Sequence, residues 1–234
     1  MNSLDLYARF EPLIGFEREI EALHDLYLQE LLNRGAKKVL DIGCGSGALL
    51  LKLQLAGIEA KGIDLSGEMV ERALKKGARA ERIDLSAESG FYDAAIAVFD
   101  VINYLPPNDL EGFFREVAKK ISRFFIFDIN SLYGFQEIAV GDLILRDQKI
   151  HATVSSIYKE RQLISNFDLF EPDKDGKYRR SSSQIVQYYH SPQSVKGALA
   201  DALFTIESVD EYRLYNQRRA DKLIFTALYQ STPR

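Results

Sequence analysis

The 234-residue sequence has little cysteine and no long apolar run, and each shortage excludes a class of protein. Its one cysteine, Cys44, cannot form a disulfide within the chain. A membrane-spanning helix needs about 18 or more consecutive apolar residues, and no such run occurs, so we expect no membrane partner. Residues 1–7 lack the basic segment and apolar stretch of a secretion signal. We therefore expect a cytoplasmic protein.

Excess positive charge and clustered metal ligands are also missing. Lys and Arg number 30 against 34 Asp and Glu, and the basic residues are scattered as pairs. Because nucleic-acid binders carry a concentrated basic surface, we expect no nucleic-acid partner. The three histidines form no cluster with metal-ligand spacing, so no metal is expected. No Gly-x-Ser-x-Gly nucleophile motif is present either.

The most informative stretch of the sequence is a glycine-rich segment, residues 39–47. Its apolar beginning predicts a buried parallel strand, and the leucine-rich residues 48–53 predict a helix. Gly43, Gly45 and Gly47 let the backbone turn tightly and approach a ligand at the helix N-terminus. Asp41 would place a negative charge there, which suits a cationic ligand. The spacing of Gly43, Gly45 and Ala48 also satisfies a loose dinucleotide-binding pattern.

Later strands are also followed by acidic residues. Asp64 lies 21 residues after Gly43, where α/β nucleotide folds bind ribose hydroxyls, although it could simply cap a helix. Asp84 follows a third strand within residues 78–86, with a helix N-cap as the alternative. A central strand, 94–99, continues into Asp-Val-Ile-Asn-Tyr-Leu (100–105), and a helix is expected over 108–122 with Asn108 as its cap. A fifth strand, 124–130, ends in Asp-Ile-Asn.

These motifs, in this order, resemble those of class I S-adenosylmethionine (SAM) dependent methyltransferases. The segments 99–105 and 124–130 resemble the small-molecule subgroup, which includes glycine and amino-sugar N-methyltransferases. The resemblance implies an α/β fold with a Rossmann-like, seven-stranded, mostly parallel sheet and helices on both faces. It also implies SAM as cofactor, S-adenosylhomocysteine as product and a small-molecule substrate. The cofactor contacts that it implies are Tyr7, Asp41, Gly43, Cys44, Gly45, Asp64, Leu65, Met69, Asp84, Leu85 and Phe99.

A change of periodicity after strand five predicts an antiparallel β insertion. Residues 140–190 are rich in β-branched and aromatic side chains, with a turn at 172–176. We expect three regions: 1–139, with a helical lid and the SAM-binding core; 140–190, forming a roof over the acceptor; and 191–234, completing the core. One face of the insertion is expected to pack on the core and the other to meet the acceptor. The alternative is a dimerisation sheet, so a homodimer is possible.

The catalytic residues are the least constrained by the sequence. A sulfonium methyl group is transferred largely by positioning, and a base is needed only for a protonated nucleophile. The candidates are Asn103, Tyr104 and His151, acting on an N or O nucleophile. Two alternatives stay open: a SAM-binding regulatory protein without turnover, and an NAD-dependent oxidoreductase, against which Asp41 and the later acids argue.

Overall fold

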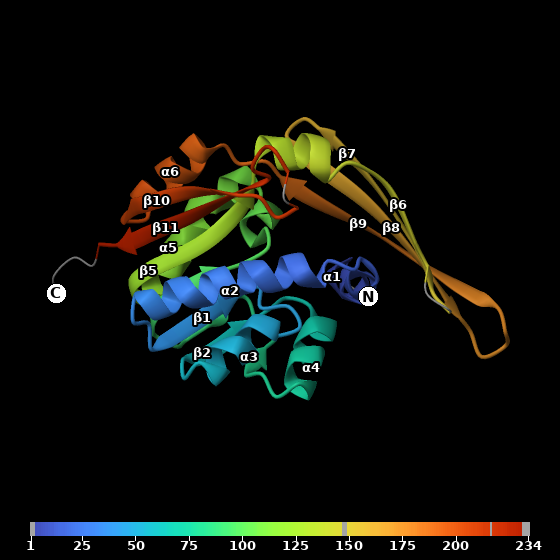
Figure 1. Ribbon diagram of the computed structural model, residues 1–234, viewed down its shortest axis with the longest axis horizontal. Coiled ribbons are helices and arrows are strands. Elements are labelled where there is room, and N and C mark those ends of the chain that lie inside the picture. Colours follow the sequence, from blue (N-terminus) through green and yellow to red (C-terminus); the bar gives the residue numbers. More distant parts are fainter. Residues whose placement is uncertain (1–2, 147–148, 216, 231–234) are drawn as a thin grey trace.

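The computed structural model describes residues 3–146, 149–215 and 217–230, and its centre is a seven-stranded sheet (Figure 1). In spatial order its strands are β10 (Phe204–Tyr212), β11 (Lys222–Tyr229), β5 (Ile121–Asn130), β4 (Tyr92–Ala97), β1 (Lys38–Ile42), β2 (Glu59–Ile63) and β3 (Ala80–Glu81). Strands β5, β4, β1, β2 and β3 are parallel, and β11 runs antiparallel to both of its neighbours. The carboxyl ends of the parallel strands therefore share one edge of the sheet.

Helices cover both faces of this sheet because its strands carry apolar side chains on both sides. One face packs on α2 (Glu17–Asn33), α3 (Ala48–Leu55) and α4 (Gly67–Lys75), and the other on α5 (Leu110–Lys120) and α6 (Pro192–Asp201). In the core between the sheet and α5 and α6, the rings of Phe127 and Phe225 stack with their centres 5.1 Å apart. The predicted Rossmann-like architecture is confirmed.

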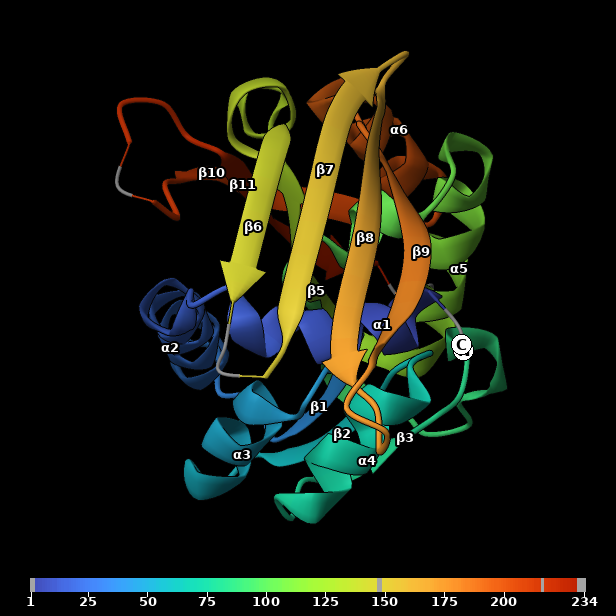
Figure 2. The same cartoon turned by 90° about the vertical axis from the view of Figure 1, so that its right-hand side faces the viewer.

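A second sheet of four antiparallel strands follows β5. It consists of β6 (Gly141–Arg146), β7 (His151–Lys159), β8 (Gln162–Pro172) and β9 (Tyr178–Tyr188). Helix α1 (Ser3–Phe10) lies behind this sheet in Figure 2. Leu6 and Phe10 of α1 pack against Ala152, Phe167 and other apolar residues of its inner face. The outer face carries exposed side chains such as Asn166.

The expectation about the two faces of this insertion was wrong. The inner face of the second sheet both packs on α1 and lines the main cavity, at different positions along its strands. The outer face points away from α1, and side chains on it such as Ile157 and Asn166 are exposed.

Several element boundaries also differ from the predictions. Strand β4 begins and ends two residues earlier than expected, at Tyr92 and Ala97. Strand β3 has only two paired residues, since charged side chains flank it at the edge of the sheet. Strand β5 begins at Ile121, directly after α5. Helix α5 begins at Leu110 after a short 3-10 turn, Pro107–Asp109, so Asn108 is not its cap. None of the helices in the described residues is long and apolar enough to cross a membrane.

Candidate functional site

A cavity of about 1690 Å³ extends along the carboxyl edge of the parallel strands and under the inner face of the second sheet. All eleven residues predicted to contact the cofactor line this cavity, and so does Tyr104. They come from α1, from the segments that follow β1 and β2, and from the loops after β3 and β4. The topology therefore brings together residues that are spread over nearly 100 positions of the sequence.

The glycine-rich turn after β1 requires glycine for two different reasons. Gly43 has φ +73°, and a Cβ there would lie 2.5 Å from Cγ2 of Val101. Gly45 has φ +52°, but no atom lies within 4 Å of the position its Cβ would take. Since Gly45 lines the cavity, its open side faces space that a ligand can fill.

Asp64 joins the two loops that border this part of the cavity. Its Oδ2 accepts the backbone N–H of Gly45 at 2.9 Å, and its Oδ1 accepts that of Ser66 at 2.8 Å. Ser66 in turn caps α4 by accepting the N–H of Met69 at 3.3 Å. Each carboxylate oxygen has a second lone pair, so Asp64 can still accept hydrogen bonds from a ligand.

Asp41 and Asp64 make this end of the cavity unfavourable for negative charge. Asp41 is only 2% exposed, and burial together with the charge of Asp64 raises its pKa to about 7. Burial also raises the pKa of Asp64, against the effect of its backbone hydrogen bonds. A cation placed here would stabilise both carboxylates. Burial raises the pKa of Cys44 as well, so its thiol stays protonated and is a poor nucleophile.

Asp84 fits both interpretations that the sequence left open. Its side chain accepts the N–H of Ser86 at 2.9 Å and caps a 3-10 turn, Leu85–Ala87. The hydroxyl of Ser86 also donates to this carboxylate, at 2.6 Å, and together with the backbone N–H it lowers the pKa of Asp84, which is therefore ionised at neutral pH. The residue lines the cavity at the same time. Capping holds the carboxylate in place, so the cap does not exclude a contact with a ligand.

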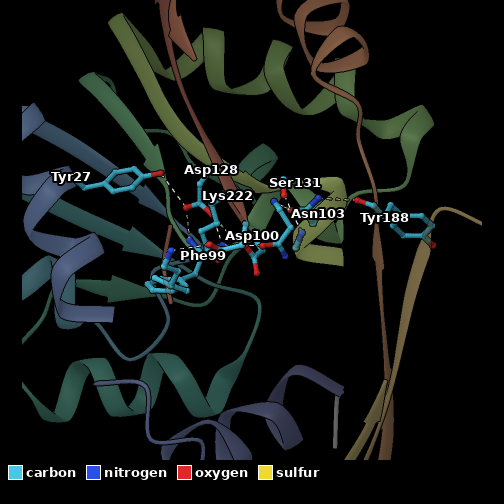
Figure 3. Close-up of polar contacts among 12 residues, drawn as sticks. Tyr27, Phe99, Asp100, Asn103, Asp128, Ser131, Tyr188 and Lys222 are labelled. Carbon is cyan, nitrogen blue, oxygen red and sulfur yellow. Dashed lines mark hydrogen bonds and ion pairs between the residues drawn. The ribbon is translucent and has the colours of Figure 1, made fainter. Parts of the chain in front are cut away.

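A buried polar network shapes the segment after β4 (Figure 3). Phe99 and Asp100 both have φ 64°, a conformation that side chains other than glycine rarely adopt. The carboxylate of Asp128, on β5, accepts the backbone N–H of Phe99 at 2.8 Å and that of Asp100 at 3.0 Å. The hydroxyl of Tyr27 donates to it at 3.1 Å. Asp128 thus holds the strained turn that brings Phe99 and Asp100 to the cavity.

Lys222, on β11, supplies the positive charge of this network. Its ammonium is fully enclosed, contacts Asp100, and lies 3.0 Å from Asp128 and 3.2 Å from the side-chain oxygen of Asn130. Although burial opposes its charge, the two carboxylates raise the pKa of Lys222. The side chain of Asp100 remains 22% exposed on the cavity wall. Burial raises the pKa of Asp100, while Lys222 lowers it.

Sequence reasoning missed Asp100 and Lys222. Asp100 stands inside a motif that was recognised as a strand exit, but its strained backbone and its ion pair are not visible in the sequence. Lys222 is the first residue of an apolar strand and meets its partners only across the sheet, opposite Asn130. A lysine at the start of an apolar strand was the one available signal.

The three predicted catalytic residues occupy different environments. Tyr104 lines the cavity, and burial raises its pKa, so it remains a phenol at neutral pH. Asn103 is fully buried and bonds backbone groups with both side-chain atoms, Tyr188 O and Asn130 N, each at 2.9 Å. His151 is exposed on β7, where its ring lies 5.8 Å from that of Tyr178, and it does not line the cavity. Tyr104 is thus the one of the three that the structure places at the cavity.

Comparison with known proteins assigns a family to this site. Residues 39–122 match the family model of a methyltransferase domain. The chain therefore carries a methyltransferase domain, in keeping with the class I resemblance of its motifs. A curated protein of Geobacillus sp. (strain WCH70), named as a methyltransferase, is 27% identical over 200 residues, which cover 76% of this chain and 78% of that protein.

Solved structures share the fold of this methyltransferase over nearly its whole length. A SAM-dependent methyltransferase from Clostridium acetobutylicum has a TM-score of 0.80 at 18% identity, covering 97% of this chain and 100% of that one. A SAM-bound amino pentose methyltransferase from Micromonospora echinaspora has a TM-score of 0.70 at 18% identity, covering 96% and 97%. SAM is the ligand named for both of these neighbours.

The residues at the cavity fit this cofactor. Gly45 leaves open space beside the backbone, and the carboxylates of Asp41 and Asp64 favour a cationic ligand. SAM carries a positively charged sulfonium and ribose hydroxyls, which such carboxylates can bind. Among the described residues, no group of three or more His, Cys, Asp or Glu side chains could hold a metal ion.

Proposed function

We propose that this methyltransferase transfers the methyl group of SAM to the amine nitrogen of a small molecule. The observation that carries the proposal is the carboxylate of Asp100, which is held against Lys222 and exposed to the cavity. An amine that arrives as an ammonium ion is attracted to such a carboxylate and must lose a proton before its nitrogen can attack.

The charge of the cavity supports an amine over an anionic acceptor. Twelve acidic residues and three lysines, Lys52, Lys76 and Lys222, line the cavity. Lys52 pairs with Glu21 and Asp25, and Lys222 pairs with Asp100 and Asp128. Only Lys76, which bonds Ser46, lacks an acidic partner among the ion pairs of the described residues. A carboxylate or phosphate on the acceptor would therefore meet mainly repulsion.

Six of the eleven cofactor-contact residues have a proposed task. The open side of Gly45 admits the ligand close to the backbone, and Asp64 accepts hydrogen bonds from the ribose hydroxyls. Asp41 contributes negative charge beside the cation, and Asp84 with Leu85 borders the adenine ring. Tyr7 lines the cavity from α1. Burial raises the pKa of its hydroxyl, so Tyr7 stays a neutral phenol.

The chain promotes the reaction mainly by positioning. When bound, SAM supplies an electrophilic methyl group on a sulfonium sulfur. Asp100 orients the amine and accepts the proton that its nitrogen loses, and burial increases the affinity of this carboxylate for a proton. Tyr104 serves as a hydrogen-bond donor rather than a base, because its pKa is raised. Asn103 acts indirectly, by tying the end of β9 to the ends of the parallel strands.

The second sheet is proposed as the roof of the acceptor site. Its inner face lines the same cavity as the cofactor residues, so a small molecule held there would lie between the sheet and Asp100. Among the structural neighbours, the one from Micromonospora echinaspora is an amino pentose methyltransferase, which is in keeping with a small amine acceptor.

A matched acceptor screen tests this proposal. The enzyme is incubated with methyl-labelled SAM and sets of compounds that share a ring but carry an amine, an alcohol or a carboxylate. We expect label to appear only in amines, with S-adenosylhomocysteine formed in equal amount. Transfer to alcohols or carboxylates with no transfer to amines would contradict the amine assignment.

A further inference from the structure

The roof carries a pair of hydroxyl groups that neither the fold nor the proposed reaction requires. Ser156 of β7 and Ser165 of β8 face each other in the antiparallel register. Their Oγ atoms lie 2.7 Å apart, and both serines line the cavity. They are only 7% and 8% exposed, so the pair is embedded in the surface of the roof rather than standing out from it.

The surroundings of this pair are apolar. Side chains two residues apart on a strand share a face, so Ser156 follows Ala152 and Val154, and Ser165 lies between Leu163 and Phe167. Near α1 the apolar residues of this face, Ala152, Phe167 and Leu169, pack with Leu6 and Phe10. The polar residues there lie toward the far ends of β8 and β9, and Glu171 pairs with Arg9 of α1. Ser156 and Ser165 lie farther along the strands, where the face borders the cavity. The next polar group along the roof is Gln187, paired with Leu163.

The two hydroxyls cannot satisfy each other. Each is one donor and can accept two hydrogen bonds, and the bond between them uses one of their two hydrogens. Among the described residues, no further partner exists for the remaining hydroxyl hydrogen, whichever serine carries it. A buried donor without a partner is costly, so this position favours a ligand that brings an acceptor oxygen.

We propose that Ser156 and Ser165 bind an oxygen atom on the acceptor, at the end remote from its amine. This proposal rests on the proposed amine function, because Asp100 provides the opposite anchor of the same molecule. The expected acceptor is then a molecule with an amine at one end, a mainly apolar middle part, and a hydroxyl or carbonyl oxygen at the other end. The apolar roof residues contact the body, and the serine pair selects the oxygen.

Two probes that differ only in that oxygen test the serine pair. Cyclohexylamine and trans-4-aminocyclohexanol are titrated into the enzyme saturated with S-adenosylhomocysteine. We expect the aminocyclohexanol to bind about 3- to 10-fold more tightly, the range that one neutral hydrogen bond provides. In the double variant Ser156→Ala/Ser165→Ala the two affinities should become equal. Ser155→Ala, on the exposed outer face of the same strand, is the control and should keep the preference.

Equal binding of the two probes by the unaltered enzyme would overturn the proposal, and so would a preference that survives in the double variant. Failure of both amines to bind counts instead against the amine function. A measurement without a ligand then decides the role of the serines. If the pair is only structural, the double variant loses a useful hydrogen bond and its Tm falls by about 2–4 °C. A binding role predicts an unchanged or higher Tm, because the unpaired donor is removed.

Discussion

At the residue scale, Asp41 makes SAM binding depend on pH. The pKa of Asp41 is about 7 in the folded protein without cofactor, against an ordinary value of 3.8 in the unfolded chain. Between these two pH values the folded protein therefore holds a proton on Asp41 that the unfolded chain has released. Since the native state then binds more protons than the unfolded one, this carboxyl favours folding less as pH rises through that range. A bound cation stabilises the carboxylate, so cofactor binding should expel the proton.

SAM affinity is therefore expected to rise with pH up to about 7, by at most about tenfold per pH unit, and then to level off. Titration calorimetry in buffers of different ionisation enthalpy measures both the affinity and the released proton. Asp41→Asn should flatten the curve. Asp84→Asn is the control, because Asp84 has a lowered pKa and does not titrate in this window. An unchanged slope in Asp41→Asn would contradict the account.

The two kinds of glycine in the turn after β1 can be separated by substitution. Gly45→Val forces a β-branched residue into φ +52° and fills the open space on the cavity side. Gly57→Val is a matched control, since Gly57 has φ +80°, equally open surroundings and no contact with the cavity. Each variant should lose about 1–3 kcal/mol of unfolding free energy. Only Gly45→Val should lose SAM binding, and loss in both variants would show that backbone strain is the cause.

At the element scale, Lys222 couples the last strand to the turn after β4. Lys222→Met leaves the buried Asp128 and the partly buried Asp100 without a compensating charge, which should cost about 3–5 kcal/mol of unfolding free energy at pH 8. The loss should shrink at acidic pH, where one aspartate can be protonated. Urea unfolding at both pH values measures this, with the exposed Lys196→Met as control. A loss independent of pH would contradict the electrostatic role of Lys222.

The sequence predicted the elements better than their ends. Strands β1, β2 and β4 were recognisable because apolar runs alternate with capping residues and glycines, and the four strands of the second sheet were visible from their β-branched and aromatic content. The length of β3 was overestimated. An edge strand is only as long as its pairing with the neighbouring strand, here β2, and the sequence does not show that pairing. A helical lid with Tyr7 at the cavity was expected, but the packing of α1 on the second sheet was missed for the same reason. The apolar face that covers Leu6 and Phe10 lies more than 140 residues away.

At the scale of the whole molecule, α1 connects the two halves of the active site. Phe10 packs edge-to-face on Phe167 of the roof at 5.1 Å, and Tyr7 lines the cavity one helical turn earlier. Asp5 of the same helix accepts a hydrogen bond from the hydroxyl of Ser66, which caps α4. The contacts of one short helix therefore reach both the roof and the cofactor end of the cavity.

Truncation of Phe10 should consequently loosen the roof and spare the core. Phe10→Ala removes a fully buried ring, for which a loss of about 3–5 kcal/mol is typical. Hydrogen exchange should accelerate in β8 and β9 while β1, β4 and β5 stay protected. Phe91→Ala, at a ring that is 58% exposed, is the control. Uniform acceleration over both sheets would mean that the roof does not unfold separately.

Some expectations for the whole molecule stay predictions. The homodimer and the lack of affinity for nucleic acid are two of them, and sedimentation of the enzyme alone and with bulk tRNA checks both. The division of the chain into the regions 1–139, 140–190 and 191–234 is another prediction. Residues 1–2 of the first region and 231–234 of the last lie outside the described part of the chain.

The central claim is that the α/β core holds SAM while Asp100 receives an amine under the roof. Asp100→Asn tests it most directly, with SAM affinity and methyl transfer measured on the same preparation and an amine acceptor from the screen. We predict SAM affinity within about 3-fold of the unaltered enzyme, and transfer slowed by about 10²- to 10⁴-fold, the usual contribution of a positioned acid or base. Unimpaired transfer in Asp100→Asn would contradict the account.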